Sequence, residues 1–180
     1  MTWSLIAREA DGSFGVAIAS RFFAVGALCV HTAPVGALTT QALFNPLYGR
    51  AGIGRLAAGD APDAVVAALT AADAGRDQRQ LHVIGTRGAP AAYTGVACID
   101  WCGQLTGDDF SVTGNMLAGP TVLDETARVW RAGAGRPLAE RLIAAMAAGQ
   151  AAGGDKRGQQ SAALRIQRGE DYPALDIRVD

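Results

Sequence analysis

Lysine, histidine and long apolar runs are scarce in this sequence of 180 residues. Lys156 is the single Lys among 16 basic residues, and the Arg residues are scattered, so the chain offers no basic cluster for nucleic-acid phosphates. The longest uninterrupted apolar stretch, residues 22–30, is far shorter than the ~20 residues of a membrane-spanning helix. No basic segment followed by an apolar one opens the chain. We therefore expect no nucleic-acid partner, no membrane partner and a cytoplasmic location.

Cysteine is also rare, with three residues at Cys29, Cys98 and Cys102. Two closely spaced thiols and two distant histidines, His31 and His82, supply too few ligands for a metal site. Cys29 and His31 are two residues apart, which would place them on one face of a strand. A Cys in an apolar strand is, however, typical of core packing. We expect reduced structural thiols, no metal and no cofactor.

Apolar and small residues are abundant instead. Hydrophobic residues make up 49% of the chain, and its 23 Gly follow no Gly-X-Y period, so collagen-like and disordered classes are excluded. The formal net charge is −1. A chain of this length hides roughly 70% of its surface on folding. The sequence therefore predicts a single domain over residues 1–180 with its own core.

Two pairs of β-rich segments open the chain. They are residues 3–8 with 15–20 and residues 25–31 with 35–41. Asp11-Gly12 between the first two segments is a strong hairpin signal, and Ala33-Pro34 separates the second two. The segments are mostly apolar on both faces, which indicates strands that are covered on both sides.

Two pairs of helices are expected to interrupt the strands. Asn45-Pro46 fits the N-cap and first residue of one helix, which ends near Gly59, and Asp60 fits the cap of the next, which ends near Gly75. Later helices are expected over residues 121–131 and 137–148, later strands over 80–85, 91–94, 161–167 and 174–179, and a Gly-rich irregular stretch before residue 121. This order predicts an α+β fold in which two antiparallel sheets pack face to face with helices outside each, a four-layer α-β-β-α sandwich.

The N-terminus could carry chemistry, because Thr2 lies at the start of the first expected strand. Removal of Met1 would leave Thr2 with both a hydroxyl and a free α-amine. An α-amine has a pKa near 7.7–8.0, so it can serve as the general base for its own side-chain hydroxyl. Thr is also commonplace at this position, so the pattern alone favours a structural Thr.

Five segments resemble a bacterial family of unknown function, DUF1028. They are residues 2–8, 15–27, 40–42, 114–119 and 152–164. The similarity covers nearly the whole chain, and its most specific motif is the last of these segments, residues 152–164. The family is grouped with the N-terminal-nucleophile hydrolases, whose fold is an α-β-β-α sandwich. The resemblance therefore implies hydrolysis of an amide bond by a first-residue nucleophile, here Thr2.

The beginning of the chain also resembles the wider superfamily, in which proteasome-type subunits carry Asp-Ser-Arg at the end of the second strand. Ser20 and Arg21 match this motif, and Ala19 stands in place of the acid. The Lys that helps to acidify the nucleophile in those relatives has no counterpart around Gly26. Arg21 could supply the missing positive charge, or it could be an ordinary ion-pair or solvated residue. Ser20 is the next candidate for the nucleophile.

Further polar residues are candidates for the site. The segment around Gln41 falls where relatives place the backbone amide of an oxyanion hole. Asn45 could orient a substrate or simply cap a helix, and Asn115 could belong to the site or to an ordinary turn. The glycine-rich loop at residues 153–161 could hold a charged or amide substrate, or be a C-cap followed by a solvated turn. Its candidates for substrate binding are Asp155, Arg157 and Gln159.

The leading hypothesis is a small-molecule amidohydrolase that cleaves a linear or cyclic amide with Thr2 as nucleophile. The alternative is a non-catalytic ligand-binding or assembly module on the same fold. The expected helix over residues 137–148 carries Ala144, Ala145, Ala147 and Ala148 besides its core-facing apolar residues, so its C-terminal half is apolar almost all round. Ala also tolerates solvent. We expect this helix to be covered by a second copy, which predicts a homodimer or higher homo-oligomer.

Overall fold

The computed structural model describes residues 2–180, which form two antiparallel sheets. The larger sheet has the strand order β10-β9-β2-β1-β8-β7. Its strands are β1 (Thr2–Arg8), β2 (Phe14–Ser20), β7 (Gly103–Thr106), β8 (Phe110–Asn115), β9 (Ser161–Gln167) and β10 (Pro173–Val179). The smaller sheet has the order β3-β4-β5-β6. Its strands are β3 (Val30–Ala33), β4 (Gly36–Ala42), β5 (Arg79–Gly85) and β6 (Ala91–Thr94).

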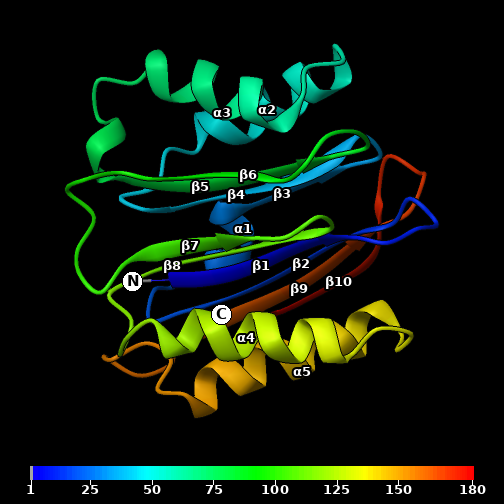
Figure 1. Cartoon of the computed structure of the whole chain (residues 1–180). Coiled ribbons are helices and arrows are strands. Elements are labelled where there is room, and N and C mark those ends of the chain that lie inside the picture. Colours follow the sequence, from blue (N-terminus) through cyan, green and yellow to red (C-terminus); the bar gives the residue numbers. More distant parts are fainter. Residues whose placement is uncertain (1) are drawn as a thin grey trace.

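The helices cover the outer faces of the two sheets, so the molecule has four layers (Figure 1). The pair over the smaller sheet is α2 (Leu47–Ala57) and α3 (Pro62–Ala71), and the pair over the larger sheet is α4 (Thr121–Ala132) and α5 (Leu138–Ala151). A short helix, α1 (Val25–Cys29), lies between the sheets. The expected pair of antiparallel sheets with helices outside is confirmed.

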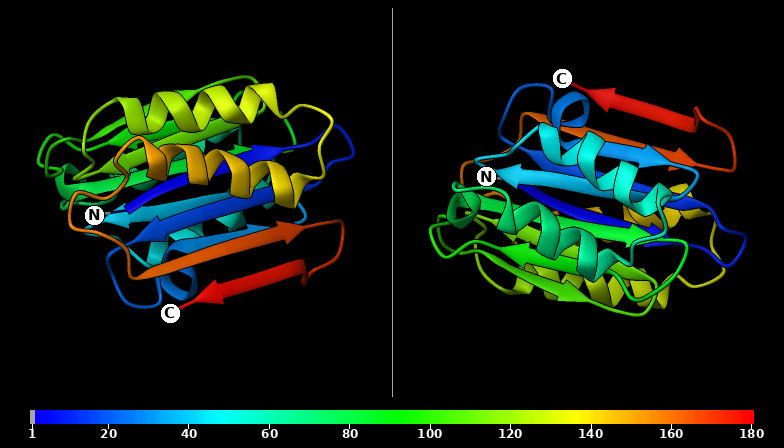
Figure 2. Two further views of the ribbon diagram at one scale, coloured as in Figure 1. Left: turned by 90° about the horizontal axis from the view of Figure 1, so that it is seen from below. Right: turned by 90° about the horizontal axis from the view of Figure 1, so that it is seen from above.

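The outer helices do not cover the larger sheet evenly. Figure 2 (left) shows α4 and α5 crossing this sheet and leaving β10, in red, uncovered at its edge. The core beneath these helices is built on Trp3, Leu5 and Val112 from the strands and on Trp130 and Leu142 from the helices, all of them buried. None of the helices among residues 2–180 is long and apolar enough to cross a membrane.

The segment 25–31, expected to be a strand, is mostly helical. Its first five residues form α1, and β3 begins only at Val30. The buried residues Val25, Gly26 and Cys29 follow helical rather than alternating spacing. A Cβ at Gly26 would lie 2.3 Å from the Ala163 Cβ, so this position has to be glycine for the turn to pack on β9. A run that is apolar throughout fits either element, because periodicity alone does not separate a buried strand from a short buried helix.

Two predicted helix starts are also displaced. Pro46, not Asn45, is the N-cap of α2, although the Asn45 Oδ1 accepts a hydrogen bond from the Leu47 amide at 3.1 Å and so still serves the helix end. Ala61 is the N-cap of α3, and Asp60 instead forms an ion pair with Arg55.

The stretch expected to be irregular contains the hairpin of β7 and β8. β8 lies next to β1 in the larger sheet, with Asn115 as its last residue and not in a loop. Its sequence FSVTGN alternates apolar and polar residues. Gly107 before this strand and Gly114 within it obscure the alternation, because glycine is depleted in strands. A Cβ at Gly114 would lie 2.5 Å from the Leu117 side chain, which explains the glycine by close packing.

Candidate functional site

Thr2 lies in a polar row that crosses the end of the larger sheet. The strand register places Asn115, Thr2, Ser20 and Ser161 side by side on β8, β1, β2 and β9. The Thr2 Oγ1 and Ser20 Oγ are 3.0 Å apart, and both side chains are buried. The sheet therefore brings together the two residues that the sequence suggests as nucleophiles. The removal of Met1, on which the Thr2 mechanism depends, concerns a residue outside those that the structure describes.

Two side-chain amides hold the carbonyl oxygen of Thr2. The Gln41 Nε2 and the Asn115 Nδ2 each donate to this oxygen at 3.3 Å. The same two groups donate to the Gln80 Oε1, at 2.7 Å and 3.0 Å respectively. Gln41 was expected to contribute through its backbone, but the contact that the structure shows is made by its side chain. These two side chains, which we call the clamp, fix the backbone of Thr2 from both sheets at once, because Gln41 lies on β4 and Asn115 on β8.

A buried polar network continues from this clamp between the two sheets. Ser4 is its second centre: its Oγ donates to the Gln41 Oε1 at 2.8 Å and lies 2.9 Å from the His82 Nε2. The His82 Nδ1 lies 3.1 Å from the Ser111 Oγ. The buried polar residues of this network, which we call the polar layer, are Ser4, Thr39, Gln41, Gln80, His82, Ser111, Thr113 and Asn115.

Burial keeps His82 neutral. Desolvation lowers its pKa to about 3, because the charged imidazolium would lose its hydration between the sheets. A group with this pKa is not a base that titrates near neutral pH. His82 therefore acts in the polar layer as a neutral hydrogen-bonding residue.

The backbone is strained at the same end of the molecule. Among residues 2–180, the non-glycine residues with positive φ are Ala24 at 53°, Ala42 at 66° and Met116 at 53°. Ala42 directly follows Gln41 and Met116 directly follows Asn115, the two residues of the clamp, and Ala24 lies in the segment after Ser20. Residues held in this region of φ cluster at functional sites, where the surrounding structure imposes the strain.

Asp155 ties the glycine-rich loop to the end of β2. Its buried carboxylate accepts hydrogen bonds from the Arg21 amide at 3.0 Å, from the Arg157 amide at 2.7 Å and from the Arg157 Nη2 at 3.2 Å. The Arg21 guanidinium in turn donates to the Arg157 carbonyl. The Gln160 amide donates to the Ser20 carbonyl at 3.1 Å. One charged cluster beside Ser20 thus contains three of the residues predicted from the sequence, Arg21, Asp155 and Arg157.

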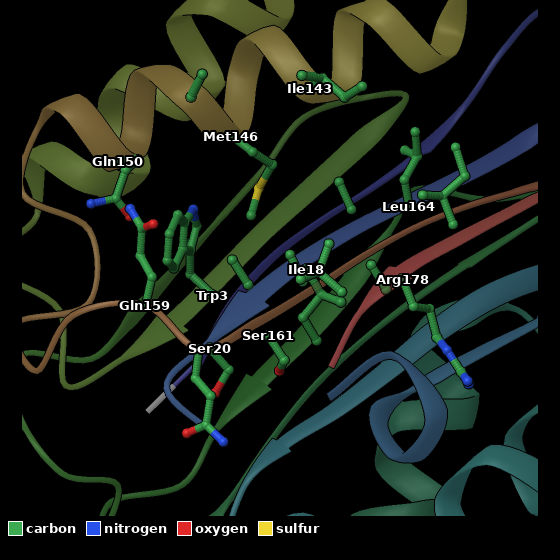
Figure 3. A pocket seen from close by; sticks show the side chains of 18 of the residues that line it. Trp3, Ile18, Ser20, Ile143, Met146, Gln150, Gln159, Ser161, Leu164 and Arg178 are labelled. Carbon is green, nitrogen blue, oxygen red and sulfur yellow. The ribbon is translucent and has the colours of Figure 1, made fainter. Parts of the chain in front are cut away.

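The remaining two candidates lie elsewhere. Asn45 belongs to a polar cluster at the start of α2, where its Nδ2 donates to the Asp73 Oδ2 at 3.2 Å. Tyr48 and Arg79 bind the same carboxylate, and the hydrogen bond from Arg79 is the main cause that holds the pKa of Asp73 well below its usual value. Gln159 is exposed and lines a groove against α5 (Figure 3).

Sequence reasoning missed the polar layer itself, and above all Gln80, Ser4 and His82. A signal was present. β5 and β8 alternate polar and apolar residues, as in a strand with one solvated face. Because helices cover the outer faces, the polar side of these strands has to face the opposite sheet instead.

The described cavities do not open onto the Thr2 hydroxyl. The larger, of about 480 Å³, lies between α5 and the strands β2, β9 and β10, with Trp3 and Ser20 at one end. The smaller, of about 250 Å³, lies at the opposite end of the smaller sheet, around Asp60 and Arg87. Thr2 lines neither of them, and it is 5% exposed.

Comparison with known proteins places the chain in a family. The crystal structure of protein SPO2555 from Silicibacter pomeroyi, described as DUF1028, is similar to this fold with a TM-score of 0.91 and 28% sequence identity. The alignment covers 99% of this chain and 81% of that one. No curated protein matches the sequence significantly. The model of a family of unknown function, DUF1028, matches residues 2–180, and the chain therefore belongs to the DUF1028 family.

Proposed function

We propose that this protein is a small-molecule amidohydrolase of the N-terminal-nucleophile superfamily, with Thr2 as its nucleophile. The observation that carries the proposal is the concentration of strained backbone around Thr2: Ala42 and Met116 follow the two residues that clamp its carbonyl, and Ala24 lies beyond Ser20. Backbone strain of this kind costs about 1–3 kcal/mol per residue and persists where function requires a fixed geometry. A purely structural strand end has no need of it.

The residues around Thr2 fit defined roles in such a reaction. The Thr2 Oγ1 attacks the carbonyl carbon of a substrate amide, and the α-amine left by removal of Met1 takes the hydroxyl proton. The same amine returns this proton to the leaving nitrogen as the C–N bond breaks. Water then hydrolyses the ester on Thr2 and releases the acid. Ser20 orients the hydroxyl of Thr2 at 3.0 Å.

The surrounding polar groups position the reactants. Gln41 and Asn115 fix the backbone of Thr2, so that its amine and hydroxyl keep one relative orientation. The backbone around Gln41 is the expected oxyanion donor. The charged cluster of Arg21, Asp155 and Arg157 lies beside Ser20 and supplies charge for binding a polar substrate.

The burial of Thr2 favours the alternative, a non-catalytic ligand-binding or assembly module. A nucleophile has to be reached by its substrate, and Thr2 is 5% exposed and lines neither described cavity. In this case the polar row at the end of the larger sheet would be structural only.

One set of measurements separates the two functions. We expect intact mass to show loss of Met1 from native, untagged protein, and wild type to hydrolyse at least one member of a panel of small amides, lactams, ureides and peptides. Thr2→Ala should abolish turnover without changing the fold, whereas Thr2→Ser should retain part of the turnover. The rate should rise through about pH 7–8, where an α-amine loses its proton.

Thr106→Ala, at an exposed position of β7, is the matched control and should retain full activity. Retention of Met1 on active protein would exclude the Thr2 mechanism. Equal activity of Thr2→Ala would move the nucleophile to Ser20, which Ser20→Ala then tests. No turnover of any compound by protein that lacks Met1 would favour the binding module.

A further inference from the structure

β10 lies at an edge of the larger sheet and is long for an edge strand. Among residues 2–180, the larger sheet ends in β10 and β7, and the smaller sheet ends in β3 and β6. β10 has seven residues, whereas β7, β3 and β6 have four each. Proteins commonly keep edge strands short, because the unpaired backbone groups of a long edge attract another strand. β10 therefore lacks the protection by length that the other edge strands have.

The free edge of β10 is open along most of its length. One edge of the strand pairs with β9, and none of the described residues pairs with the other edge. Figure 2 shows that α4 and α5 do not cover it either. A proline and a shift of register, which discourage pairing, occur only at its beginning, between Pro173 and Leu175. The stretch from Leu175 to Val179 is thus a regular strand with an unprotected edge.

The side chains of this stretch are separated by face. Leu175 packs against the core beneath α4 and α5, and Ile177 and Val179 line the groove beside α5 on the same face. Ile177 is 52% exposed and Val179 is 64% exposed, so this face is apolar and open to solvent. Asp176 and Arg178 alternate with these residues and lie on the opposite face, where the Arg178 stem is close to α1. The free edge therefore has one apolar face and one face with an acid and a base.

A second copy of the same strand matches both faces. A two-fold axis perpendicular to the sheet pairs the two strands antiparallel and keeps each face on its own side. With Ile177 on the axis, Asp176 lies opposite the partner's Arg178, and Arg178 lies opposite the partner's Asp176. On the other face, Leu175 lies opposite the partner's Val179. Directly opposite side chains are in contact, and opposite charges or apolar groups in such pairs stabilise a sheet.

The charges select this register over its neighbours. An axis at Asp176 or at Arg178 would place two like charges directly opposite each other, which is destabilising. An axis at Leu175 would leave both charged residues without an opposite charge. An axis at Val179 would pair only the end of the strand. The register centred on Ile177 is the one in which charged residues meet opposite charges and apolar residues meet apolar residues.

We propose that the protein forms a homodimer in which two β10 strands pair antiparallel about Ile177, so that two sheets of six strands each become one continuous sheet. The ion pairs within each copy, Arg165 with Asp176 at 2.8 Å and Arg178 with Asp180 at 3.6 Å, then continue across the interface as a row of alternating charge. The contact forms at the sheet edge and not on the apolar side of α5. It is independent of the proposed reaction, because β10 carries no residue of the polar row.

A cysteine on the proposed axis tests the register directly. Directly opposite residues of an antiparallel pair have Cα atoms about 4.5–5.5 Å apart, within the range that a disulfide spans. Ile177→Cys should therefore give a disulfide-linked dimer on mild oxidation with diamide, seen on a non-reducing gel. Val179→Cys is the matched control on the same face: its two copies are four residues out of register, or about 13 Å apart, and should not link. Wild type, with Cys29 buried and Cys98 and Cys102 half-buried, should not link either.

Charge reversal tests the same register without a covalent bond. Asp176→Arg places two bases opposite each other, and Arg178→Asp places two acids opposite each other. Each variant alone should dimerise at least tenfold more weakly than wild type in light scattering at micromolar concentration. An equimolar mixture of the two variants should dimerise again, because each base of one copy then meets an acid of the other.

Mixing also controls for effects within one chain. The contact of residue 176 with Arg165 is the same in each variant before and after mixing, so recovery reports the contact between copies. Asp108→Arg, at an exposed position between β7 and β8, should dimerise like wild type.

The opposite results would overturn the proposal. Wild type that stays a monomer throughout the micromolar range has no such interface. A dimer that links through Val179→Cys as readily as through Ile177→Cys has another register. A dimer that neither charge variant weakens, and that Ile143→Lys on α5 dissociates, is held together by the apolar side of that helix instead; Ile143 is 56% exposed. Two charge variants that stay monomeric when mixed would show that their charges do not meet across the axis.

Discussion

The layer between the two sheets is apolar in one half and polar in the other. The apolar half is built on Ile6, Phe14, Val16, Ile18, Val25, Cys29, Val30, Ala37, Ile84 and Ala163, all buried. The polar half is the polar layer, which adjoins Thr2. A single strand shows the change: the residues of β5 that face the larger sheet are Gln80, His82 and Ile84.

The two halves are stabilised by different physics. Burial of apolar area stabilises the first by roughly 25 cal/mol per Å² and tolerates changes of shape. The second gains little net free energy from its hydrogen bonds but loses much if one partner is removed, because the others then stay buried and unsatisfied. We infer that the apolar half holds the sheets together and that the polar half fixes the geometry of the end that carries Thr2.

The largest effect is expected at Gln80, which links five partners. Its Oε1 accepts from Gln41 and Asn115, and its Nε2 donates to the Thr94 Oγ1 at 2.9 Å, the Gly103 carbonyl at 3.1 Å and the Gly114 carbonyl at 2.8 Å. Gln80→Leu removes all of these hydrogen bonds from a fully buried position, and should lower the free energy of unfolding by about 3 kcal/mol or more. Urea denaturation followed by circular dichroism measures this loss.

Two controls keep this test specific to the polar half. Ile84→Val, on the same strand in the apolar half, should cost about 1 kcal/mol. Gln78→Leu, at an exposed position shortly before Gln80, should change the stability by less than about 0.5 kcal/mol. If Gln80→Leu lowers the free energy of unfolding no more than Ile84→Val does, the inference that the polar half is more sensitive to the loss of one side chain is wrong.

A smaller effect is expected from pH, through His82. Its folded pKa of about 3 lies below the value of about 6.5 of an unfolded His, so the unfolded chain binds more protons between these values. Stability contributed by the neutral imidazole is therefore complete above about pH 6.5 and is lost as the pH falls toward 3. The free energy of unfolding should fall by about 1 kcal/mol per pH unit from about pH 6 to pH 4.5.

The second histidine, His31, also makes the free energy of unfolding fall as the pH is lowered. Burial also lowers the pKa of His31, so both residues contribute to the slope. His82→Gln should remove the larger share and His31→Gln the smaller. The carboxylate of Asp73, whose pKa is lowered, loses its contribution only below its ordinary value of 3.8 and does not enter this range. An unchanged slope in His82→Gln would show that the polar layer admits a proton.

The smallest effect is expected from relief of strain at Ala42. Glycine removes the cost of about 1–2 kcal/mol of the left-handed conformation but adds roughly 0.5–1 kcal/mol of chain entropy to the unfolded state. Ala42→Gly should therefore stabilise the protein by up to about 1 kcal/mol in thermal or urea unfolding. Ala51→Gly, at an exposed position in the interior of α2 without positive φ, should instead destabilise it by a similar amount. If both glycine substitutions destabilise the protein, the backbone at Ala42 is not strained, and strain does not distinguish the polar end of the molecule.

Much of the fold could be predicted from the sequence, because its strong elements carry local signals. Asp11-Gly12 marks the first hairpin, and the apolar spacing of α5 marks that helix. The predictions that failed, α1 as a strand and β8 as irregular, lie where local signals conflict with packing: Gly26 lies against Ala163, and Gly114 lies against Leu117. In the sequence, such glycines suggest the end of a helix or strand, whereas in the fold they allow two segments to pack closely.

The candidate site was predicted less completely, and for a different reason. The sequence by itself singled out Thr2 and the charged loop at Asp155, because a hydroxyl next to Met1 and a glycine-rich polar loop are local features, and Ser20 was suggested by the resemblance to the wider superfamily. Only the tertiary structure decided that Gln80 joins Gln41 to Asn115, or that Ser4 meets His82, since these partners are separated by 35 to 78 residues. Alternation of polar and apolar residues tells which side chains share a face. Which sheet that face meets, and whether water or another side chain lies there, is determined only when the layers pack.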